Sequence, residues 1–319
     1  MTRRAMPSRP RVAKVLLIAF AVACVAGISA TPAPARPARA ALSDRPIKVC
    51  LAERLPHAPK LVVLGSSRAE KVEPSFVRSL TGLSTFNASV SGGTPDDTWA
   101  YANFLHTLPG APAQRVLWFL DVESLERSKP NPGLLATPQL APYLLFPPQV
   151  APPGSRRCSV RTSAGTTYSA RGFRAHDFHD AAVERHVSQR RSLALSITHY
   201  RTSYQRYPEL APAAEHRFEE TVSLINSWGV TPVIVLTPVH PLFEQQLAAP
   251  WTRMHQKVLN YIASLPHSLK IDFIDASSIA TFGGTRRAFY DGVHMKVANV
   301  RRLVRYVIRI AHRDLGPVP

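Results

Sequence analysis

Short apolar runs alternate with longer stretches of helical periodicity along most of the chain. Each run is only a few residues long, as is typical of buried strands. Regular alternation of strands and helices predicts βαβ units and therefore a parallel sheet. The predicted strands cover residues 60–65, 83–88, 115–120, 230–236 and 271–274.

The segments between these strands carry the signals that begin and end helices. Pro95 and Asp96 favour a helix start, and Gly229 favours a helix end. In the last helix the apolar side chains fall on one face and the arginines lie elsewhere. The arginine-bearing side is most simply interpreted as exposed to solvent. The predicted helices cover residues 69–80, a stretch that begins at residue 95, and residues 212–228, 250–265 and 297–313.

More than a hundred residues separate the third and fourth predicted strands, far more than an ordinary crossover needs. Residues 124–153 are rich in proline, and residues 155–203 are rich in Arg, Ser and His. Neither stretch has enough apolar periodicity for a core of its own. We therefore predict a single α/β domain over residues 46–319, with a long insertion at about 124–210.

The N-terminus has the composition of an export signal. A basic start precedes an uncharged run over residues 15–30, and Ala38-Arg39-Ala40 fits a small-residue cleavage site. Because the run is short for a membrane span of about 20 residues, a cleaved signal is favoured over an uncleaved anchor. Residues 31–45 are predicted to form an unfolded Pro/Ala/Arg linker. The mature protein is thus expected in the periplasm, outside the cell or at its surface.

The charge of the chain is basic with or without this leader. Residues 1–45 hold eight Lys or Arg and one acid, so their removal lowers the formal net charge from +18 to +11. Such a balance favours contact with anionic envelope polymers or the membrane surface, although a merely solvated basic surface is an equal alternative. No nucleic-acid-binding motif accompanies the charge, so nucleic acid is not an expected partner.

Two cysteines remain outside the leader, Cys50 and Cys158. In an oxidising compartment they indicate one disulfide that ties the start of the mature chain to the insertion. Two unpaired buried thiols are the alternative, and only geometry distinguishes them.

Three polar segments occur where active sites of parallel sheets are found, beyond the carboxyl ends of strands. Ser67 follows the first strand in a Gly-Ser-Ser turn, before a helix whose free N–H groups favour a developing oxyanion. Gly92 follows the second strand, where a glycine lets the backbone approach a bound group. Asp291 and His294 stand three apart before the last helix, as a carboxylate and an imidazole that together activate a hydroxyl. Each signal alone also fits an ordinary turn, and Asp291 with His294 alone could equally be a metal pair.

Together, the order of these segments resembles the SGNH (GDSL-type) hydrolase family, in particular an exported bacterial branch with a Gly-Ser-Ser first block. That branch looks related to polysaccharide O-acetylation and D-alanylation proteins. The resemblance covers about residues 58–312 without the insertion. It implies a flavodoxin-like three-layer α/β/α sandwich with a five-stranded parallel sheet in the order 2-1-3-4-5. It also implies Ser67 as the nucleophile, Asp291 and His294 as its partners, and the N–H groups of Ser67 and Gly92 as oxyanion donors.

The sequence departs from the family pattern in two blocks. Ser66 replaces the acid of the usual Gly-Asp-Ser, and the third block, normally Gly-x-Asn-Asp, is missing after Leu120. Its asparagine would be a further oxyanion donor, and the loss of one donor costs about a hundredfold or more in rate. Either the insertion supplies a substitute, or the protein is slow or inactive.

The leading hypothesis is thus a serine esterase or O-acyltransferase acting on acyl, preferably acetyl, esters of envelope carbohydrate or on small esters. The alternative is a non-catalytic protein that binds envelope glycan or assists its assembly. Arg68 and His240 are candidate substrate-binding residues. Alternatively, Arg68 pairs with an acid such as Asp121, and His240 is an ordinary loop residue. No cofactor is expected, and no further Cys/His/Asp cluster beside Asp291 and His294 has the spacing of a metal site.

Overall fold

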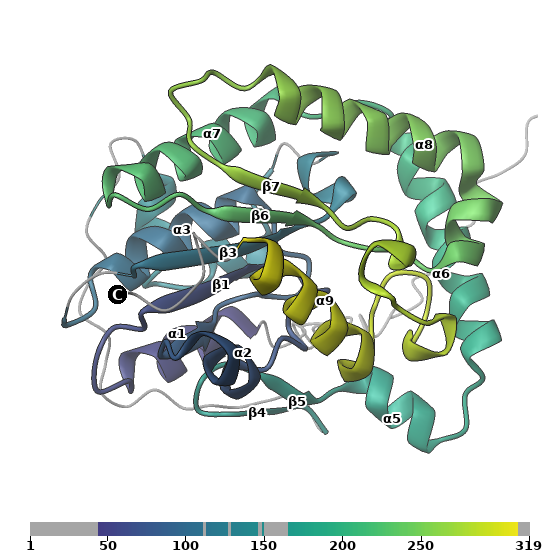
Figure 1. Cartoon of the computed structure of the whole chain (residues 1–319), viewed down its shortest axis with the longest axis horizontal. Coiled ribbons are helices and arrows are strands. Elements are labelled where there is room, and N and C mark those ends of the chain that lie inside the picture. Colours follow the sequence, from purple (N-terminus) through teal and green to yellow (C-terminus); the bar gives the residue numbers. More distant parts are fainter. Residues whose placement is uncertain (1–43, 111–112, 127–128, 146–148, 150–164, 312–319) are drawn as a thin grey trace, which may run out of the picture. The chain divides into compact units, whose positions relative to one another are not determined.

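The computed structural model describes residues 44–110, 113–126, 129–145, 149 and 165–311. Five strands form one all-parallel sheet in the order β2-β1-β3-β6-β7 (Figure 1). Counted along the chain within this sheet, the order is 2-1-3-4-5, which confirms the predicted topology. The strands are β1 (Leu61–Gly65), β2 (Thr85–Asn87), β3 (Arg115–Leu120), β6 (Val233–Leu236) and β7 (Asp272–Asp275).

Both faces of the sheet are buried, so its strands are apolar throughout rather than alternating. In β1, Leu61 and Val63 join one buried cluster, and Val62 and Leu64 join another on the opposite face. The first cluster includes side chains of α2 (Pro74–Thr81) and α9 (Val297–Ile310). The second includes side chains of α1 (Asp44–Glu53), α3 (Pro95–His106), α7 (Pro212–Ser227) and α8 (Pro241–Ser264). The architecture is therefore a three-layer α/β/α sandwich.

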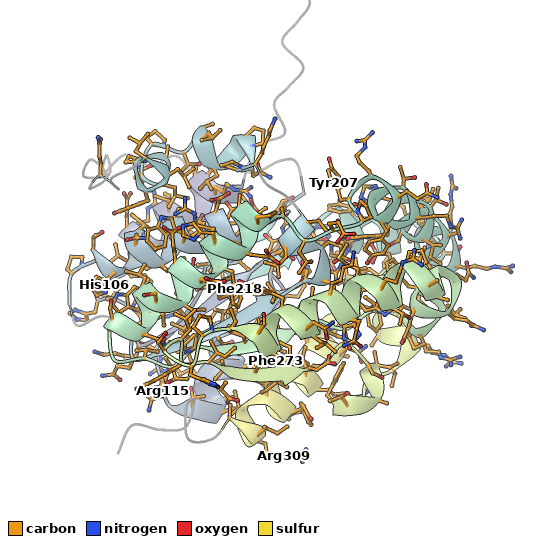
Figure 2. All side chains as sticks on the ribbon, turned by 90° about the horizontal axis from the view of Figure 1, so that it is seen from above. His106, Arg115, Tyr207, Phe218, Phe273 and Arg309 are labelled. Carbon is orange, nitrogen blue, oxygen red and sulfur yellow. The ribbon has the colours of Figure 1, made fainter. Side chains whose placement is uncertain are left out.

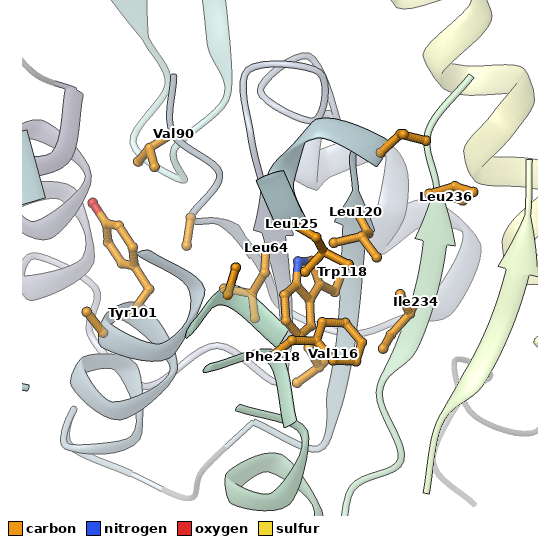
Figure 3. Close-up of a cluster of buried hydrophobic side chains, with 14 of the residues drawn as sticks. Leu64, Val90, Tyr101, Val116, Trp118, Leu120, Leu125, Phe218, Ile234 and Leu236 are labelled. Carbon is orange, nitrogen blue, oxygen red and sulfur yellow. The ribbon is translucent and has the colours of Figure 1, made fainter. Parts of the chain in front are cut away.

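The larger cluster is built around aromatic packing on β3. Trp118 is buried against Phe218 of α7, with ring centroids 4.8 Å apart (Figure 3). Offset aromatic pairs of this kind add to the free energy gained from burial. Figure 2 shows His106 and Arg115 at the end of the domain where the strands begin.

Prolines explain most differences between predicted and observed boundaries. The helix predicted over 69–80 begins only at Pro74, in the first-turn position that proline favours. The strand predicted over 230–236 begins after Pro232, which has no N–H for the ladder. The helix predicted over 250–265 begins earlier, at Pro241, and α8 is kinked at Ala248 just before Pro250.

The described chain opens with a helix that the sequence did not reveal. α1 begins at Asp44, so the last two residues of the predicted linker are helical, while the rest of the leader lies outside the described residues. Among the residues described, the structure has no helix both long and apolar enough to cross a bilayer. Cys50 of α1 is buried and disulfide-bonded. Cys158 lies outside the described residues, so its pairing with Cys50 stays a prediction.

The segment between β3 and β6 adds several helices and a hairpin to the domain. α6 (Gln189–Arg206) contributes Leu193 and Ile197 to the same buried cluster as the sheet, rather than to a core of its own. The other described elements of this segment are η1 (Val122–Glu126), α4 (Pro132–Leu135), η2 (Ala141–Leu144), the hairpin of β4 (Thr167–Tyr168) and β5 (Arg174–His176), and α5 (Phe178–Glu184).

Candidate active site

The three segments singled out in the sequence meet at the carboxyl edge of the sheet. The Oγ of Ser67 lies 2.9 Å from Nε2 of His294. On the other side of the ring, Nδ1 of His294 lies 2.8 Å from Oδ2 of Asp291. Hydroxyl, imidazole and carboxylate therefore form a continuous hydrogen-bonded relay.

A tight turn after β1 holds Ser67 in place. Gly65 has φ +142°, and a Cβ there would stand 2.6 Å from the carbonyl oxygen of Phe119, so only glycine fits. The hydroxyl of Ser66 bonds the carboxylate of Asp121 and accepts the backbone N–H of Arg68 at 3.2 Å. Ser66 thus anchors the turn to the end of β3 and leaves Ser67 to face His294.

The loop before α9 folds so that its acid and its histidine face each other. Oδ1 of Asp291 accepts the backbone N–H groups of Val293 and His294, each at 2.8 Å, and the N–H of Tyr290 bonds the carbonyl of His294. Burial by itself would raise the pKa of Asp291, but His294 and these N–H groups together hold that pKa well below its usual range. The carboxylate is therefore charged wherever the protein is folded near neutral pH.

The second loop packs its backbone directly against the Ser67 turn. The N–H of Val90 bonds the carbonyl of Gly65 at 3.1 Å. A Cβ on Gly93 would stand 2.7 Å from that same carbonyl and 3.2 Å from Cα of Ser66, so glycine is required. Within the described residues, no hydrogen bond uses the backbone N–H of Ser67 or of Gly92. Both donors are thus free to bind an oxygen of a ligand.

A buried charge network fixes Ser91, the residue before Gly92. Oδ2 of Asp44 accepts the Ser91 N–H at 2.7 Å, and Arg45 donates to the Ser91 carbonyl at 3.3 Å. The Ser91 hydroxyl donates to Glu70 at 3.1 Å, and Arg174 of β5 pairs with the same carboxyl at 2.5 Å. α1 and the hairpin therefore hold the second loop from two sides.

Two neighbouring carboxyls of this network have pKa values that are shifted in opposite directions. Burial and then the charge of Asp44 raise the pKa of Glu70 well above its usual value. Burial works against the charge of Asp44 too, but its hydrogen bonds with Glu70 and with the Ser91 N–H leave its pKa lowered. Asp44 is thus the more acidic of the two carboxyls.

A small polar cavity of about 70 Å³ opens beside Ser67. Hydroxyl groups, two carboxylates and the rings of α6 surround it, and apolar side chains are scarce. Its lining consists of Ser66, Ser67, Gly92, Gly93, Thr94, Asp121, Glu123, Ser124, His199, Tyr200 and Ser203.

The two candidate substrate-binding side chains are buried and are not part of the lining of this cavity. Arg68 is 3% exposed, and its guanidinium lies 2.6 Å from Glu123 and 3.6 Å from Asp121, which favours the pairing alternative. His240 is also 3% exposed and caps α8 by accepting the N–H of Leu242. Neither lines the cavity, so substrate binding by these two residues stays a prediction without support from their surroundings.

His179, which the sequence did not single out, reaches the relay from α5. Its ring lies 4.4 Å from the ring of His294, centroid to centroid. Burial, and then the neighbouring His294, lower the pKa of His179 to about 4. One ligand atom each of His179, Asp291 and His294 lie within 4.8 Å of one another, so these three could hold a metal ion. In the sequence, Asp291 and His294 have the spacing of a possible metal pair, and the high histidine content of residues 171–201 is the only signal for His179.

Asn131 is a second neighbour that the sequence did not indicate. Its Oδ1 caps α4 by accepting the N–H of Gly133 at 2.8 Å. The amide nitrogen Nδ2 lies 3.7 Å from the position that a Cβ on Gly92 would take. An amide donor from the insertion therefore stands beside the second loop.

Comparison of the chain with protein-family models, with curated proteins and with solved structures finds no significant match. The arrangement of the side chains is thus the basis for any statement about activity.

Proposed function

We propose that this protein is a serine-dependent esterase or O-acyltransferase. The observation that carries the proposal is the relay from Ser67 through His294 to Asp291, with hydrogen-bond distances of 2.9 and 2.8 Å. A hydroxyl that hydrogen-bonds an imidazole, itself oriented by a buried carboxylate, is the arrangement that activates a serine for acyl transfer. The resemblance of the three segments to SGNH hydrolases supports the same conclusion.

The first step follows from the relay. Nε2 of His294 accepts the Ser67 proton as Oγ attacks the ester carbonyl, and Asp291 stabilises the imidazolium that forms. The carbonyl oxygen becomes an oxyanion near the free N–H groups of Ser67 and Gly92. Collapse of the tetrahedral intermediate passes the proton from His294 to the leaving alkoxide and leaves an acyl group on Ser67. Water or a second hydroxyl then takes the acyl group by the reverse sequence.

Asn131 is suited to replace the oxyanion donor missing from the third block. Its Nδ2 stands next to Gly92, and none of the described residues accepts a hydrogen bond from it. In this proposal the insertion thus contributes a third donor to the oxyanion.

The polar cavity favours a substrate with a small acyl group and several hydroxyls. A volume of about 70 Å³ suits an acetyl-sized group rather than a long acyl chain. Glu123, Ser124 and Ser203 offer hydrogen-bond partners to sugar hydroxyls. An acetyl ester of carbohydrate is therefore the preferred substrate class, and export to the envelope, where such polymers occur, remains part of the proposal.

The proposal is tested with the purified protein and a chromogenic acetyl ester. Ser67→Ala should abolish hydrolysis, and Asp291→Asn, which keeps the Oδ1 acceptor of the turn, should lower kcat by about 10³–10⁴. Ser79→Ala, an exposed serine on α2, is the matched control and should hydrolyse at the rate of the unchanged protein. Equal rates for Ser67→Ala and the control would remove Ser67 from the mechanism.

One feature supports the non-catalytic alternative, a glycan-binding or assembly protein on the same scaffold. Arg302, Arg305 and Arg309 of α9 line an open groove of about 460 Å³, in which none of the lining residues is acidic. This function requires retention on an anionic polysaccharide that weakens with salt. It also requires that a serine-directed fluorophosphonate leave the protein unlabelled.

A further inference from the structure

His179 has no evident role in the proposed acyl transfer, although its ring faces the relay. It lies in the first turn of α5, and its ring contacts His294 and Tyr290, at centroid distances of 4.4 and 5.3 Å. No described residue forms a hydrogen bond with either of its ring nitrogens. A partly exposed imidazole without a partner, next to a second imidazole, is available as a ligand.

The backbone that presents His179 is firmly held. Asp177 caps α5 by accepting the N–H of His179 at 2.7 Å. Lys71 pairs with Asp180 at 2.6 Å, and the hydroxyl of Tyr290 bonds the same carboxylate. The helix that carries His179 is thus tied to both the Ser67 segment and the His294 loop.

We propose that His179, Asp291 and His294 form a binding site for a divalent transition metal such as Zn²⁺, and that the bound ion inhibits the enzyme. Two imidazole nitrogens and one carboxylate oxygen are a donor set that Zn²⁺ favours. The three ligand atoms already lie within 4.8 Å of one another. For comparison, the donors around a tetrahedral zinc ion are roughly 3.4 Å apart. In this proposal the His179 side chain rotates toward the ion, and the Asp291 oxygen and Nδ1 of His294, now 2.8 Å apart, separate slightly.

Inhibition follows from which atoms the metal would use. The Asp291 oxygen is next to Nδ1 of His294, so an ion between them replaces the proton that now joins these atoms. A neutral imidazole that binds an ion through Nδ1 carries its proton on the other nitrogen, so the Nδ1 proton is transferred, through solvent, to Nε2. With Nε2 protonated, His294 no longer accepts the proton of Ser67. The ion therefore blocks the first step without contacting the ester.

The metal site stands independently of the proposed function, whereas its inhibitory effect rests on it. Binding is therefore measured separately, by calorimetric titration of Zn²⁺ into the full-length, chelator-treated protein. We expect one site, with an affinity that falls at least tenfold in His179→Gln. Ser67→Ala should bind as the unchanged protein does. His216→Gln, which removes an exposed histidine beside Glu220, is the matched control and should also bind normally.

The effect on chemistry is measured as the rate of fluorophosphonate labelling with and without saturating Zn²⁺. Zn²⁺ should slow labelling at least tenfold in the unchanged protein and in His216→Gln, and much less in His179→Gln. Equal Zn²⁺ affinity in His179→Gln and the unchanged protein would overturn the site. Labelling that Zn²⁺ does not slow would overturn the inhibitory role. If the protein is never labelled, the proposed function fails, and calorimetry still decides the site.

Discussion

The carboxylate of Asp44 accepts a hydrogen bond of 2.7 Å from the backbone N–H of Ser91, 47 residues further along the chain. Ser91 immediately precedes Gly92, whose N–H is a proposed oxyanion donor. The first residue of α1 thereby fixes the Val90–Ser91 peptide group, one peptide unit before the proposed donor. Buried, charge-assisted hydrogen bonds of this kind are stronger than neutral ones.

Loss of this contact should weaken catalysis more than substrate binding. For Asp44→Ala we expect kcat for an acetyl ester to fall about tenfold or more, with KM little changed. A misplaced donor weakens the stabilisation of the oxyanion in the transition state but not the binding of the ester. Asp44→Asn keeps an acceptor for the Ser91 N–H and should recover part of the rate. Steady-state kinetics of the two variants measure these effects. An equal decrease of kcat in both variants would show that the charge of Asp44, and not its hydrogen bond to the Ser91 N–H, supports catalysis.

The contact between the two loops predicts that Gly93 cannot be replaced. A methyl group there would stand 2.7 Å from the carbonyl of Gly65, so Gly93→Ala should lower the free energy of unfolding by about 1–3 kcal/mol and slow labelling of Ser67. Gly82→Ala is the control, since Gly82 also has positive φ, +74°, but has nothing within 4 Å. It should lose some stability in a urea titration yet be labelled at the normal rate. Normal labelling of Gly93→Ala would contradict the packing argument.

The proposed donor on the insertion is tested at Asn131. Asn131→Ser keeps an oxygen that caps α4 but removes the amide N–H. We expect kcat to fall by about a hundredfold, which is typical for one oxyanion donor, with unchanged thermal stability. A variant as fast as the unchanged protein would leave the oxyanion to the two backbone donors alone.

Buried Lys48 predicts an unusual dependence of stability on pH. Its Nζ donates to the carbonyls of Asn87 and Gly172, and burial lowers its pKa from 10.5 to about 8, despite the opposing charges of Glu70 and Asp44. Between these pH values the unfolded chain binds the proton and the folded protein does not, so folding is favoured as the pH rises.

The free energy of unfolding, relative to that of Lys48→Met, should therefore increase by about 2 kcal/mol from pH 8 to pH 10. Lys48→Met removes this titration while the other groups titrate as before. Urea titrations at several pH values measure the difference between the two proteins. A constant difference would show that Lys48 stays charged in the folded protein.

The sequence predicts those parts of the fold and site that depend on local signals. Buried apolar runs and their spacing predict the strands and the parallel sheet, whereas the strand order is implied by the resemblance to SGNH hydrolases. Ser67, Asp291 and His294 are recognisable because they stand next to strand ends or a helix start. Their actual distances depend on how the loops fold, and so only coordinates show them.

Other features depend on contacts between distant segments, which a single sequence does not encode visibly. Arg68 is adjacent to Ser67, yet Glu123, which follows the neighbouring strand β3, determines its environment. His179 and Asn131 come from a segment without clear periodicity, and Asp44 comes from what looked like the end of a linker. These residues reach the site through tertiary packing rather than through local propensity.

The most direct test of the central claim is to locate the residue that a serine-directed fluorophosphonate modifies, by mass spectrometry of the digested protein. The account predicts a single adduct on Ser67 that forms at neutral pH and is absent from Ser67→Ala. A protein that stays unmodified, or an adduct on any other serine, would contradict it.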